Sequence, residues 1–417
     1  MLTKSQRLAR QLFKDLEALS ADPPGVTRAA YGAGEQHAHD LMTRTGEALG
    51  CAQRVDAAGN LYMTFPGRDR ARPATLVGSH LDSVPHGGNY DGAAGVVAGL
   101  ATAAAFAEAG RRPVADLTVM AIRAEEAAWF PLSYLGSRAA LGRLGADELD
   151  GACRSDTGRS LAWHMTEAGF DPTPLRAGQP QLELSRIGAF IEVHIEQGPQ
   201  LIERATPLGL VTGMNGGFRH TTAVARGQYG HSGATPRHLR RDAVLGFADL
   251  AAGLERTWND LEAAGQNATI TFGTLATDPT QHAGSKVAGE VRFCLDVRSG
   301  SATALAQVRE NLHVLSKEIA QRRGVEIDLG PGFTWPIVPL SDPLTARLGA
   351  AADALGIPTL RLASGAGHDA ATFAQAGVPS AMIFLRNANG SHNPAEQLDP
   401  SDLDQAVRVL VRFLESD

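Results

Sequence analysis

The sequence predicts an α/β protein, in which a larger domain with a mostly parallel sheet carries a smaller inserted α+β domain. Short apolar runs alternate with helical patterns through the first half, which is typical of strands joined by covering helices. A chain of 417 residues is long enough for two or three domains. A glycine-rich stretch at 209–217, GLVTGMNGG, precedes a mixed run of strand and helix patterns and is expected to be a hinge.

The elements of the larger domain are expected from apolar periodicity. Near the start, Leu8, Leu12, Phe13, Leu16 and Leu19 recur at helical spacing. The next expected elements are strands at 75–79, 117–124 and 189–195 and an Ala-rich helix at 92–109. Late in the chain, a strand at 380–385 and a helix at 401–414 would complete this domain.

The inserted domain is expected between the glycine-rich stretch and a return linker, GPGFTWP, at 330–336. Its patterns predict strands at 220–226, 269–275 and 290–297 and helices at 242–261 and 302–321. The predicted organisation is therefore 1–212 and 331–417 for the larger domain and 213–330 for the insertion.

Composition and charge narrow the classes of function. The chain carries 38 basic and 45 acidic residues, a net charge of −7, so it has no overall attraction for nucleic acid or a membrane surface. Three cysteines and no CxxC pair favour a reduced, cytoplasmic setting. The stretch at 1–19 lacks the apolar core of a signal peptide, and the most apolar stretch, at 93–107, is too short to span a bilayer.

Side chains that bind metals follow the predicted strands. His80 comes directly after the strand at 75–79, and Asp82 lies where a carboxylate can fix the tautomer of a ligating imidazole. Asp91 lies at the start of the Ala-rich helix. The alternative role of an isolated Asp at that position is an ordinary helix N-cap.

Three further clusters have the same character. Glu125 and Glu126 follow the strand at 117–124, and adjacent carboxylates on an extended chain point in different directions. One could bind a metal while its neighbour faces a reacting water; the alternative is a solvated acidic turn. His194 lies in the strand at 189–195 and His392 in a loop after the strand at 380–385. Their alternatives are a core histidine and a turn histidine.

Taken together, these histidines and carboxylates are the ligand set of a two-metal hydrolytic site. Open α/β sheets gather their ligands at the carboxyl ends of the strands, where all four clusters are predicted. Two divalent ions about 3.5–4 Å apart would share a bridging carboxylate. Mixed nitrogen and oxygen ligands suit Zn²⁺, Mn²⁺, Co²⁺ or Ni²⁺ and do not choose among them.

The order of these motifs resembles the two-metal aminoacylase and carboxypeptidase superfamily. The segments that resemble its amidohydrolase branch are HIEQGPQL, GLVTGM, GHSGATPRHLRRDAV, SGAGHDA and GSHNPAE. That branch includes N-carbamoyl-L-amino acid hydrolases, β-ureidopropionases and allantoate amidohydrolases. The resemblance runs from about Gln6 to Leu414. It implies a metal-dependent hydrolase whose inserted domain serves as a lid and as the contact surface of a homodimer.

The resemblance also implies a ligand set. His80 and His194 would bind one metal ion, Glu126 and His392 would bind the other, and Asp91 would bridge the two. The peptide bond after the bridging Asp91 is expected to be cis.

Further roles follow from the same resemblance. Glu125 would be the general base, and Asp82 would orient the first histidine ligand. His231 matches a lid histidine that reaches a substrate oxygen across the homodimer, and Gln197 and Arg298 match substrate contacts. A guanidinium can grip a substrate carboxylate at two points. The alternative for Arg298 is a structural pair with the aspartate two residues before it.

The chain departs from the family pattern near substrate-contact positions and not at the ligands. After Glu126 the usual Gly-Ser-Arg-Phe is replaced by residues 127–130, AAWF, and Ser285 stands for a usual Asn. The resemblance favours hydrolysis of N-carbamoyl-L-amino acids with release of ammonia and carbon dioxide. Two alternatives use the same metals: an allantoate amidohydrolase, and an N-acyl amino acid deacylase or peptidase. A non-catalytic binding protein is a third, but every ligand position and the base are present.

Overall fold

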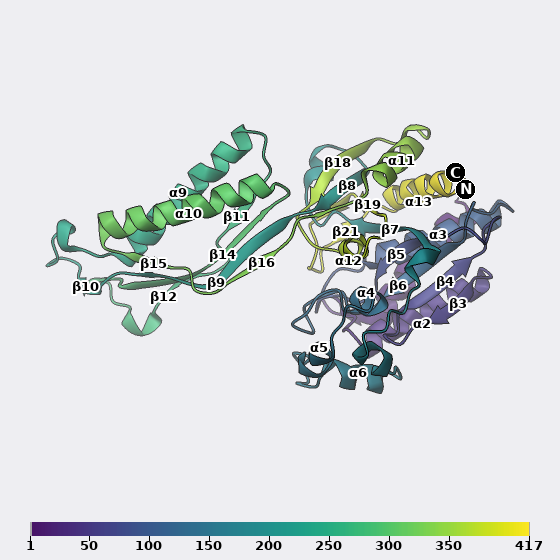
Figure 1. Cartoon of the computed structure of the whole chain (residues 1–417), viewed down its shortest axis with the longest axis horizontal. Coiled ribbons are helices and arrows are strands. Elements are labelled where there is room, and N and C mark those ends of the chain that lie inside the picture. The colour runs from purple at the N-terminus through teal and green to yellow at the C-terminus, as the bar shows by residue number, and fades with distance from the viewer. Residues whose placement is uncertain (1, 417) are drawn as a thin grey trace. The chain divides into compact units, whose positions relative to one another are not determined.

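The computed structural model describes residues 2–416. The chain forms two compact units: the segment up to Thr212 joins the segment from Pro339 onward, and Gly213–Val338 forms the second unit (Figure 1). The predicted α/β class with a mostly parallel central sheet is confirmed.

The larger unit is built on a nine-stranded sheet in the order β17-β8-β19-β7-β5-β6-β4-β3, with β18 paired to β8. Strands β19, β7, β5 and β6 are parallel neighbours, whereas β8, β4 and β3 pair antiparallel with their neighbours. The strands are β3 (Ala52–Val55), β4 (Leu61–Phe65), β5 (Ala74–His80), β6 (Leu117–Ile122), β7 (Ile187–Ile195), β8 (Leu208–Met214), β17 (Val338–Pro339), β18 (Thr359–Ser364) and β19 (Ser380–Leu385).

Three helices, α1, α3 and α13, bury their apolar faces together over this sheet. Helix α3 is the expected Ala-rich helix, and small side chains let it pack closely while it is buried almost all round. The helices of the unit are α1 (Lys4–Ser20), α2 (Ala33–Ala48), α3 (Ala93–Glu108), α4 (Leu135–Ala140), α5 (Ala146–Gly151), α6 (Leu161–Glu167), α7 (Thr173–Arg176), α8 (Gln200–Glu203), α11 (Asp342–Asp353), α12 (Asp369–Gln375) and α13 (Pro400–Glu415). Two short hairpins complete it: β1 (Ala21–Asp22) with β2 (Gly25–Val26), and β20 (Asn387–Ala388) with β21 (Gln397–Leu398).

The glycine-rich stretch at 209–217 was predicted to be a hinge; the boundary between the two units, Thr212–Gly213, lies inside it, and its first half is a strand. Residues 208–214 form strand β8, which is buried and pairs with β19. A Cβ on Gly209 would lie 2.7 Å from Leu362 Cδ2. The glycine there therefore permits close packing and does not mark a flexible joint.

The smaller unit is an antiparallel sheet in the order β11-β14-β9-β15, with β12 paired to β14 and β16 paired to β9. Helices α9 (Ala243–Ala263) and α10 (Ala302–Arg323) run side by side over one face of this sheet and bury a core of their own (Figure 1). The strands are β9 (Gly216–Arg226), β10 (Gly230–His231), β11 (Thr269–Thr271), β12 (Leu275–Thr277), β13 (Lys286–Val287), β14 (Glu290–Ser299), β15 (Glu326–Asp328) and β16 (Gly332–Trp335).

The segment expected to be the return linker is partly a strand. Gly332–Trp335 forms β16 and pairs with the start of β9, so residues 331–338 lie in the smaller unit. The strand expected at 269–275 is divided into β11 and β12, which both pair with β14.

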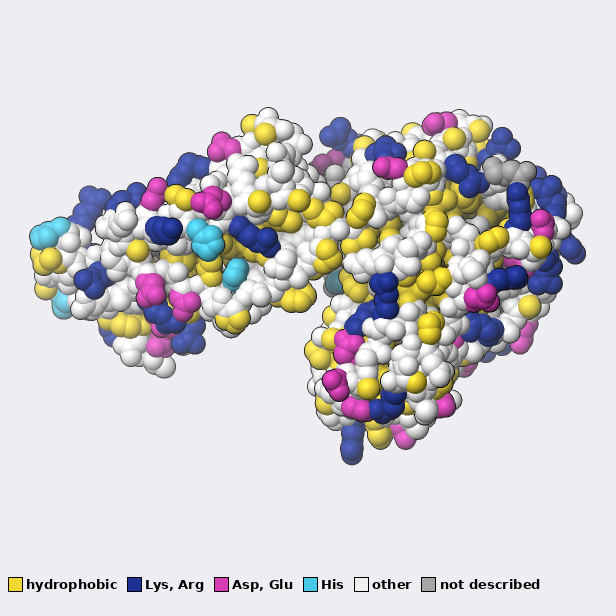
Figure 2. Space-filling view, in the orientation of Figure 1, with side chains coloured by type: hydrophobic (Ala, Val, Ile, Leu, Met, Phe, Trp, Pro, Cys, Tyr) yellow, Lys and Arg dark blue, Asp and Glu magenta, His cyan; other side chains and the backbone are white. Residues whose placement is uncertain are grey.

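Among residues 2–416, no helix is both long and apolar enough to cross a bilayer. On the face that Figure 2 shows, acidic and basic side chains of the described residues are interspersed, and no continuous basic stripe is visible. Such a stripe is the usual footprint of a nucleic-acid site.

Candidate metal centre

The metal-binding side chains of the sequence analysis converge at the carboxyl ends of the four parallel strands. His80 is the last residue of β5, and His194 lies one residue before the end of β7. The Glu125–Glu126 pair follows β6, and His392 follows β19. Because these strands are neighbours in the order β19-β7-β5-β6, their ends form one edge of the sheet.

His80, Asp91 and His194 form a group that we call the buried triad. Asp91 Oδ1 lies 3.0 Å from His194 Nε2 and 3.4 Å from His80 Nε2. The three residues are 1–4% exposed. Asp91 Oδ1 accepts no hydrogen bond, and a buried carboxylate oxygen facing two imidazole nitrogens suits a divalent cation. These residues therefore fit a metal ion.

The charges of the carboxylate and the two histidines shift one another's pKa values in the buried triad. Burial alone would raise the pKa of Asp91, but the two histidines outweigh it and hold that pKa well below the usual range. Burial would lower the pKa of His80, but the nearby carboxylates of Asp82 and Asp91 raise it well above its usual value. The pKa of His194 is raised against burial, mainly by attraction to Asp91. A bound metal ion would thus take the place of the imidazole protons that the Asp91 carboxylate stabilises.

A tight turn places Asp91 in this group. Gly92 has φ +64°, and the Asp91 carbonyl accepts a hydrogen bond from Ala93 N at 2.6 Å. A Cβ on Gly92 would lie 2.5 Å from ring atoms of His80, so only glycine fits. The expected cis bond after Asp91 is wrong, because the cis bond in the described chain is Pro23–Pro24.

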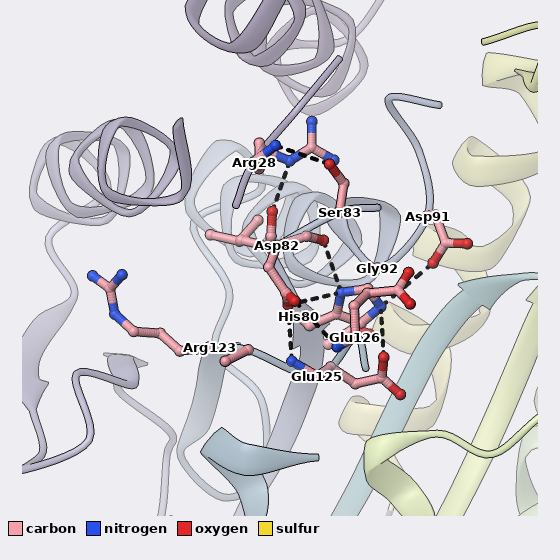
Figure 3. A network of polar contacts seen from close by, with 12 residues as sticks. Arg28, His80, Asp82, Ser83, Asp91, Gly92, Arg123, Glu125 and Glu126 are labelled. Atoms are coloured by element: carbon pink, nitrogen blue, oxygen red, sulfur yellow. Dashed lines mark hydrogen bonds and ion pairs between the residues drawn. The ribbon is translucent and has the colours of Figure 1, made fainter. Parts of the chain in front are cut away.

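Asp82 orients its neighbours in two directions, as Figure 3 shows. Its Oδ1 lies 3.3 Å from His80 Nδ1, and its backbone carbonyl lies 3.0 Å from the same nitrogen. These contacts keep the proton on Nδ1 and turn Nε2 towards Asp91. The two carboxylate oxygens also accept the backbone N–H groups of Glu125 and Glu126, at 2.9 and 3.1 Å. The second function, anchoring the acidic turn, was not predicted.

Asp91, Glu126 and His392 form a second group, which we call the loop triad. His392 Nε2 lies 3.2 Å from Glu126 Oε1 and 3.6 Å from Asp91 Oδ2. The hydrogen bond that His392 donates to the Glu126 carboxylate is the main reason why the pKa of His392 is raised to about 9. Asp91 belongs to both triads through different oxygens, which is the arrangement of a carboxylate that bridges two ions.

Glu125 faces the buried triad, and with His80 and Glu126 it forms a third group whose ligand atoms all lie within 4.8 Å of one another. Its Oε2 lies 3.9 Å from His80 Nε2. Burial, opposed in part by His80 and reinforced by the carboxylates nearby, raises the pKa of Glu125 well above its usual value. A carboxylate with a raised pKa can take up and release a proton near neutral pH.

The expected substrate contacts lie in different units. Gln197 is beside the centre, where its amide donates to Asp91 Oδ2 at 2.8 Å. Arg298, on β14, pairs with Asp296 at 2.8 Å, so the structural pairing of the sequence analysis is present. His231, on β10, is exposed, and its Nδ1 accepts the N–H groups of Gly233 and Ala234 at 3.2 Å. Their contacts with substrate stay predictions.

Several polar residues at the centre were not predicted. Glu396 is buried and accepts the N–H groups of Tyr90 and Asp91, at 2.8 and 3.1 Å, and the hydroxyl of Ser391 at 2.8 Å. The Ser391 hydroxyl also contacts Asp91 Oδ2. His368 packs its ring on His194, with centroids 4.5 Å apart. The only sequence signal was their membership in the GSHNPAE and SGAGHDA segments.

Comparisons with known proteins agree with this geometry. Residues 76–416 match the family described as Peptidase family M20/M25/M40. The chain is 34% identical over 414 residues to an N-carbamoyl-L-amino-acid amidohydrolase of Paenarthrobacter aurescens, covering 99% of this chain and 98% of the relative. An allantoate amidohydrolase of Escherichia coli (strain K12) is 30% identical over 99% of this chain and 98% of its own. A solved amidase of the hydantoinase/carbamoylase family from Burkholderia multivorans superposes with a TM-score of 0.88 at 28% identity, covering 99% and 97% of the two chains.

Proposed function

We propose that this chain, a metal-dependent amidohydrolase that belongs to peptidase family M20/M25/M40, hydrolyses the carbamoyl C–N bond of N-carbamoyl-L-amino acids. The observation that carries the proposal is the sharing of Asp91 between two triads, with Glu125 beside them. The substrate class is supported by likeness to the P. aurescens relative over nearly the whole chain.

We propose two divalent ions per subunit, Zn²⁺, Mn²⁺, Co²⁺ or Ni²⁺. His80 and His194 would hold one, Glu126 and His392 the other, and Asp91 would contact both. When bound, such a pair lowers the pKa of a water and polarises a carbonyl group. The donor set, three imidazole nitrogens and two carboxylates, is of the mixed kind that these metals accept.

Glu125 is proposed as the group that moves the proton. Its raised pKa lets it take a proton from the attacking water and return it to the leaving nitrogen of the tetrahedral intermediate. Water adds to the ureido carbonyl, and one C–N bond breaks as the tetrahedral intermediate collapses to a carbamate. The carbamate then decomposes and breaks the second C–N bond. The products are the free amino acid, ammonia and carbon dioxide.

The remaining contacts are proposed to bind and orient the substrate. Because the Nδ1 of His231 accepts two backbone N–H groups, its proton lies on Nε2, where it can be donated to a substrate oxygen. Arg298 would hold the substrate carboxylate, and Gln197 would contact the group bound at Asp91. We also propose a homodimer in which His231 serves the partner's substrate, and a reducing cytoplasmic setting, in keeping with three free cysteines.

Allantoate hydrolysis is the alternative that a specific observation favours, namely 30% identity to the E. coli relative over 99% of this chain. An N-acyl amino acid deacylase or peptidase with the same ligands is a further alternative within the family. The three differ in products, because hydrolysis of an acyl amino acid or a peptide yields no ammonia.

A panel of substrates on metal-reconstituted protein tests the proposal. Ammonia is measured with N-carbamoyl-L-amino acids, N-carbamoyl-β-alanine and allantoate, and free amine is measured with N-acetyl amino acids. We expect the highest kcat/KM with an N-carbamoyl-L-amino acid. A higher kcat/KM on allantoate, or amine release without ammonia, would assign the alternative.

The role of Glu125 is tested by Glu125→Gln, which removes the base and keeps the size of the side chain. We expect kcat to fall about 10²- to 10⁴-fold, the range that general-base catalysis contributes. Metal content, measured by elemental analysis, should stay at the wild-type value, because His80 and Glu126, the other two members of the group that contains Glu125, each keep their place in one of the two triads. Near-normal turnover would remove Glu125 from this role.

A further inference from the structure

A buried ion pair lies behind the turn that carries Glu125, and the proposed chemistry does not use it. Glu35, in the first turn of α2, and Arg123, which follows β6, are 0% and 2% exposed. Glu35 Oε2 lies 2.8 Å from Arg123 Nη1. The same guanidinium donates to the Gly59 carbonyl at 2.8 Å and to Gln36 Oε1 at 2.6 Å. The pair therefore ties the turn to helix α2 and to the loop before β4.

Glu35 completes a series of contacts with the backbone of this turn. Its Oε1 accepts the N–H of Ala124 at 2.9 Å, while Asp82 accepts the next two N–H groups, those of Glu125 and Glu126. Figure 3 shows Arg123 to the left of Glu125 and Asp82 above it. Two buried carboxylates thus hold three consecutive N–H groups, and the proposed base belongs to the middle one.

The residue that Glu35 holds has an unfavourable backbone conformation. Ala124 has φ +51°, in the left-handed region, which a residue with a Cβ seldom adopts. Because Ala124 directly precedes Glu125, its φ and ψ set the direction in which the Glu125 side chain leaves the backbone. A relaxed Ala124 would turn the carboxylate of Glu125 away from its place beside His80.

We propose that Glu35, held by Arg123, is a positioning residue that keeps Ala124 in the left-handed conformation and so aims the Glu125 carboxylate at the reacting water. This inference rests on the proposed role of Glu125. Glu35 itself touches neither substrate nor metal ligand.

The chemistry of the contacts explains why a carboxylate is needed. Glu35 accepts N–H groups from Ala124 and Tyr31, at 2.9 and 2.7 Å, and a third from Arg123. An ionised carboxylate offers acceptors only, whereas an amide of the same size must present its NH₂ group to one of these donors. Glu35→Gln therefore weakens the hydrogen bonds that hold Ala124 without leaving a cavity.

The first test is the kinetics of Glu35→Gln with full metal loading. We expect kcat to fall about 10- to 100-fold with KM and metal content unchanged, as for loss of a residue that supports a catalytic group. The matched control is Asp404→Asn on α13. The Asp404 carboxylate accepts two hydrogen bonds from the Arg10 guanidinium, at 2.7 and 3.1 Å, and the substitution removes its charge. We expect that variant to keep the wild-type kcat. A wild-type kcat in Glu35→Gln would overturn the inference.

The second test is rescue by Ala124→Gly, because glycine adopts a left-handed conformation without steric cost. The kcat of Ala124→Gly in the wild-type background is the reference value. In the Glu35→Gln background this change should restore most of the lost kcat, which a purely structural role of Glu35 does not predict. If Glu35→Gln does not fold, Glu35→Asp carries the same expectation, because it keeps the charge and shortens the reach. If Ala124→Gly restores kcat in neither the Glu35→Gln nor the Glu35→Asp variant, the positioning role of Glu35 is contradicted.

A third measurement separates this inference from the proposed function. Once Glu125→Gln has removed the base, adding Glu35→Gln should lower the residual kcat by less than about twofold. An inactive Glu125→Gln with a fully active Glu35→Gln would overturn the positioning role alone. A fully active Glu125→Gln would overturn the assignment of the base, and with it the reason for an aimed carboxylate.

Discussion

The two halves of the metal centre are built in different ways. The histidines of the buried triad lie within or at the end of the central strands β5 and β7 and are 1% exposed. In the loop triad, the His392 side chain is 49% exposed and the residue has a left-handed backbone, φ +59°. Glu126 is also outside a strand, and only Asp91 is common to both.

The sheet therefore sets the positions of the histidines in the buried triad, whereas side-chain contacts set the positions of the residues in the loop triad. The parallel register of β5 with β7, which runs from Thr75 opposite Ala189 to Gly78 opposite Glu192, brings the ends of the strands that carry His80 and His194 together. The loop triad depends on single contacts, among them Ser391 and Glu396, that bind the loop to the Asp91 turn. We therefore expect the ion of the buried triad to be held more tightly than the ion of the loop triad.

The largest expected effect comes from removing one histidine of each half. His194→Ala leaves a buried carboxylate without its partner, so we expect kcat to fall roughly 10³-fold or more and both ions to leave on dialysis. His392→Ala opens a position that water can fill, so we expect a fall of roughly 10- to 100-fold and about one ion retained. Steady-state kinetics and elemental analysis after dialysis measure both. Equal ion loss in the two variants would contradict the comparison.

The same contrast explains which parts of the fold could be predicted from the sequence. The strand at 380–385 was predicted with its bounds, because its apolar run is short, continuous and fully buried. Histidines and carboxylates just after such runs must meet at one edge of a parallel sheet, so the local pattern was enough to bring His80 and His194 together. The same pattern placed His392 after the strand at 380–385, but its pairing with Glu126 came only from the resemblance, because the loop gives no periodicity that sets its direction.

The failures have a physical cause in long-range packing. Gly209 looked like part of a hinge, but it is needed because Leu362 packs against its α-carbon. The linker segment became β16 because β9 offered a free edge, which the local sequence does not reveal. Glu35 and Glu396 were overlooked because their main partners are backbone N–H groups 89 and 305 residues away. Ordinary acidic residues give no local sign of such partners.

An intermediate effect is expected for Glu396→Gln, which weakens the connection between the two halves. An amide at this position must turn its NH₂ group towards Ser391 or towards the N–H groups of Tyr90 and Asp91. We expect the dissociation constant of the more weakly bound ion to rise about 10- to 100-fold, while the other changes less. Metal titration of chelator-treated protein measures both constants. Glu203→Gln, at an exposed position of α8, is the control. An equal change in both dissociation constants would contradict the expectation that the buried triad holds its ion more tightly than the loop triad.

The smallest expected effect is on the stability of the metal-free protein, which should depend on pH through His392 of the loop triad. His392 has a pKa of about 9 in the folded chain against an ordinary value of 6.5, so the folded state binds its proton more tightly than the unfolded state. Its contribution to stability is therefore complete below pH 6.5 and disappears as the pH rises through about 9. Because the side chain is 49% exposed, solvent reduces this contribution to a small one.

The effect is measured by thermal unfolding of chelator-treated wild type and His392→Asn from pH 6 to pH 10. The wild type should be the more stable at pH 6, and the difference should vanish by about pH 10, because the neutral imidazole no longer forms an ion pair with Glu126. Metal-loaded protein should lack this pH dependence, since a bound ion takes the place of the proton. A difference that is constant across this range would show that the contact between His392 and Glu126 is not ionic.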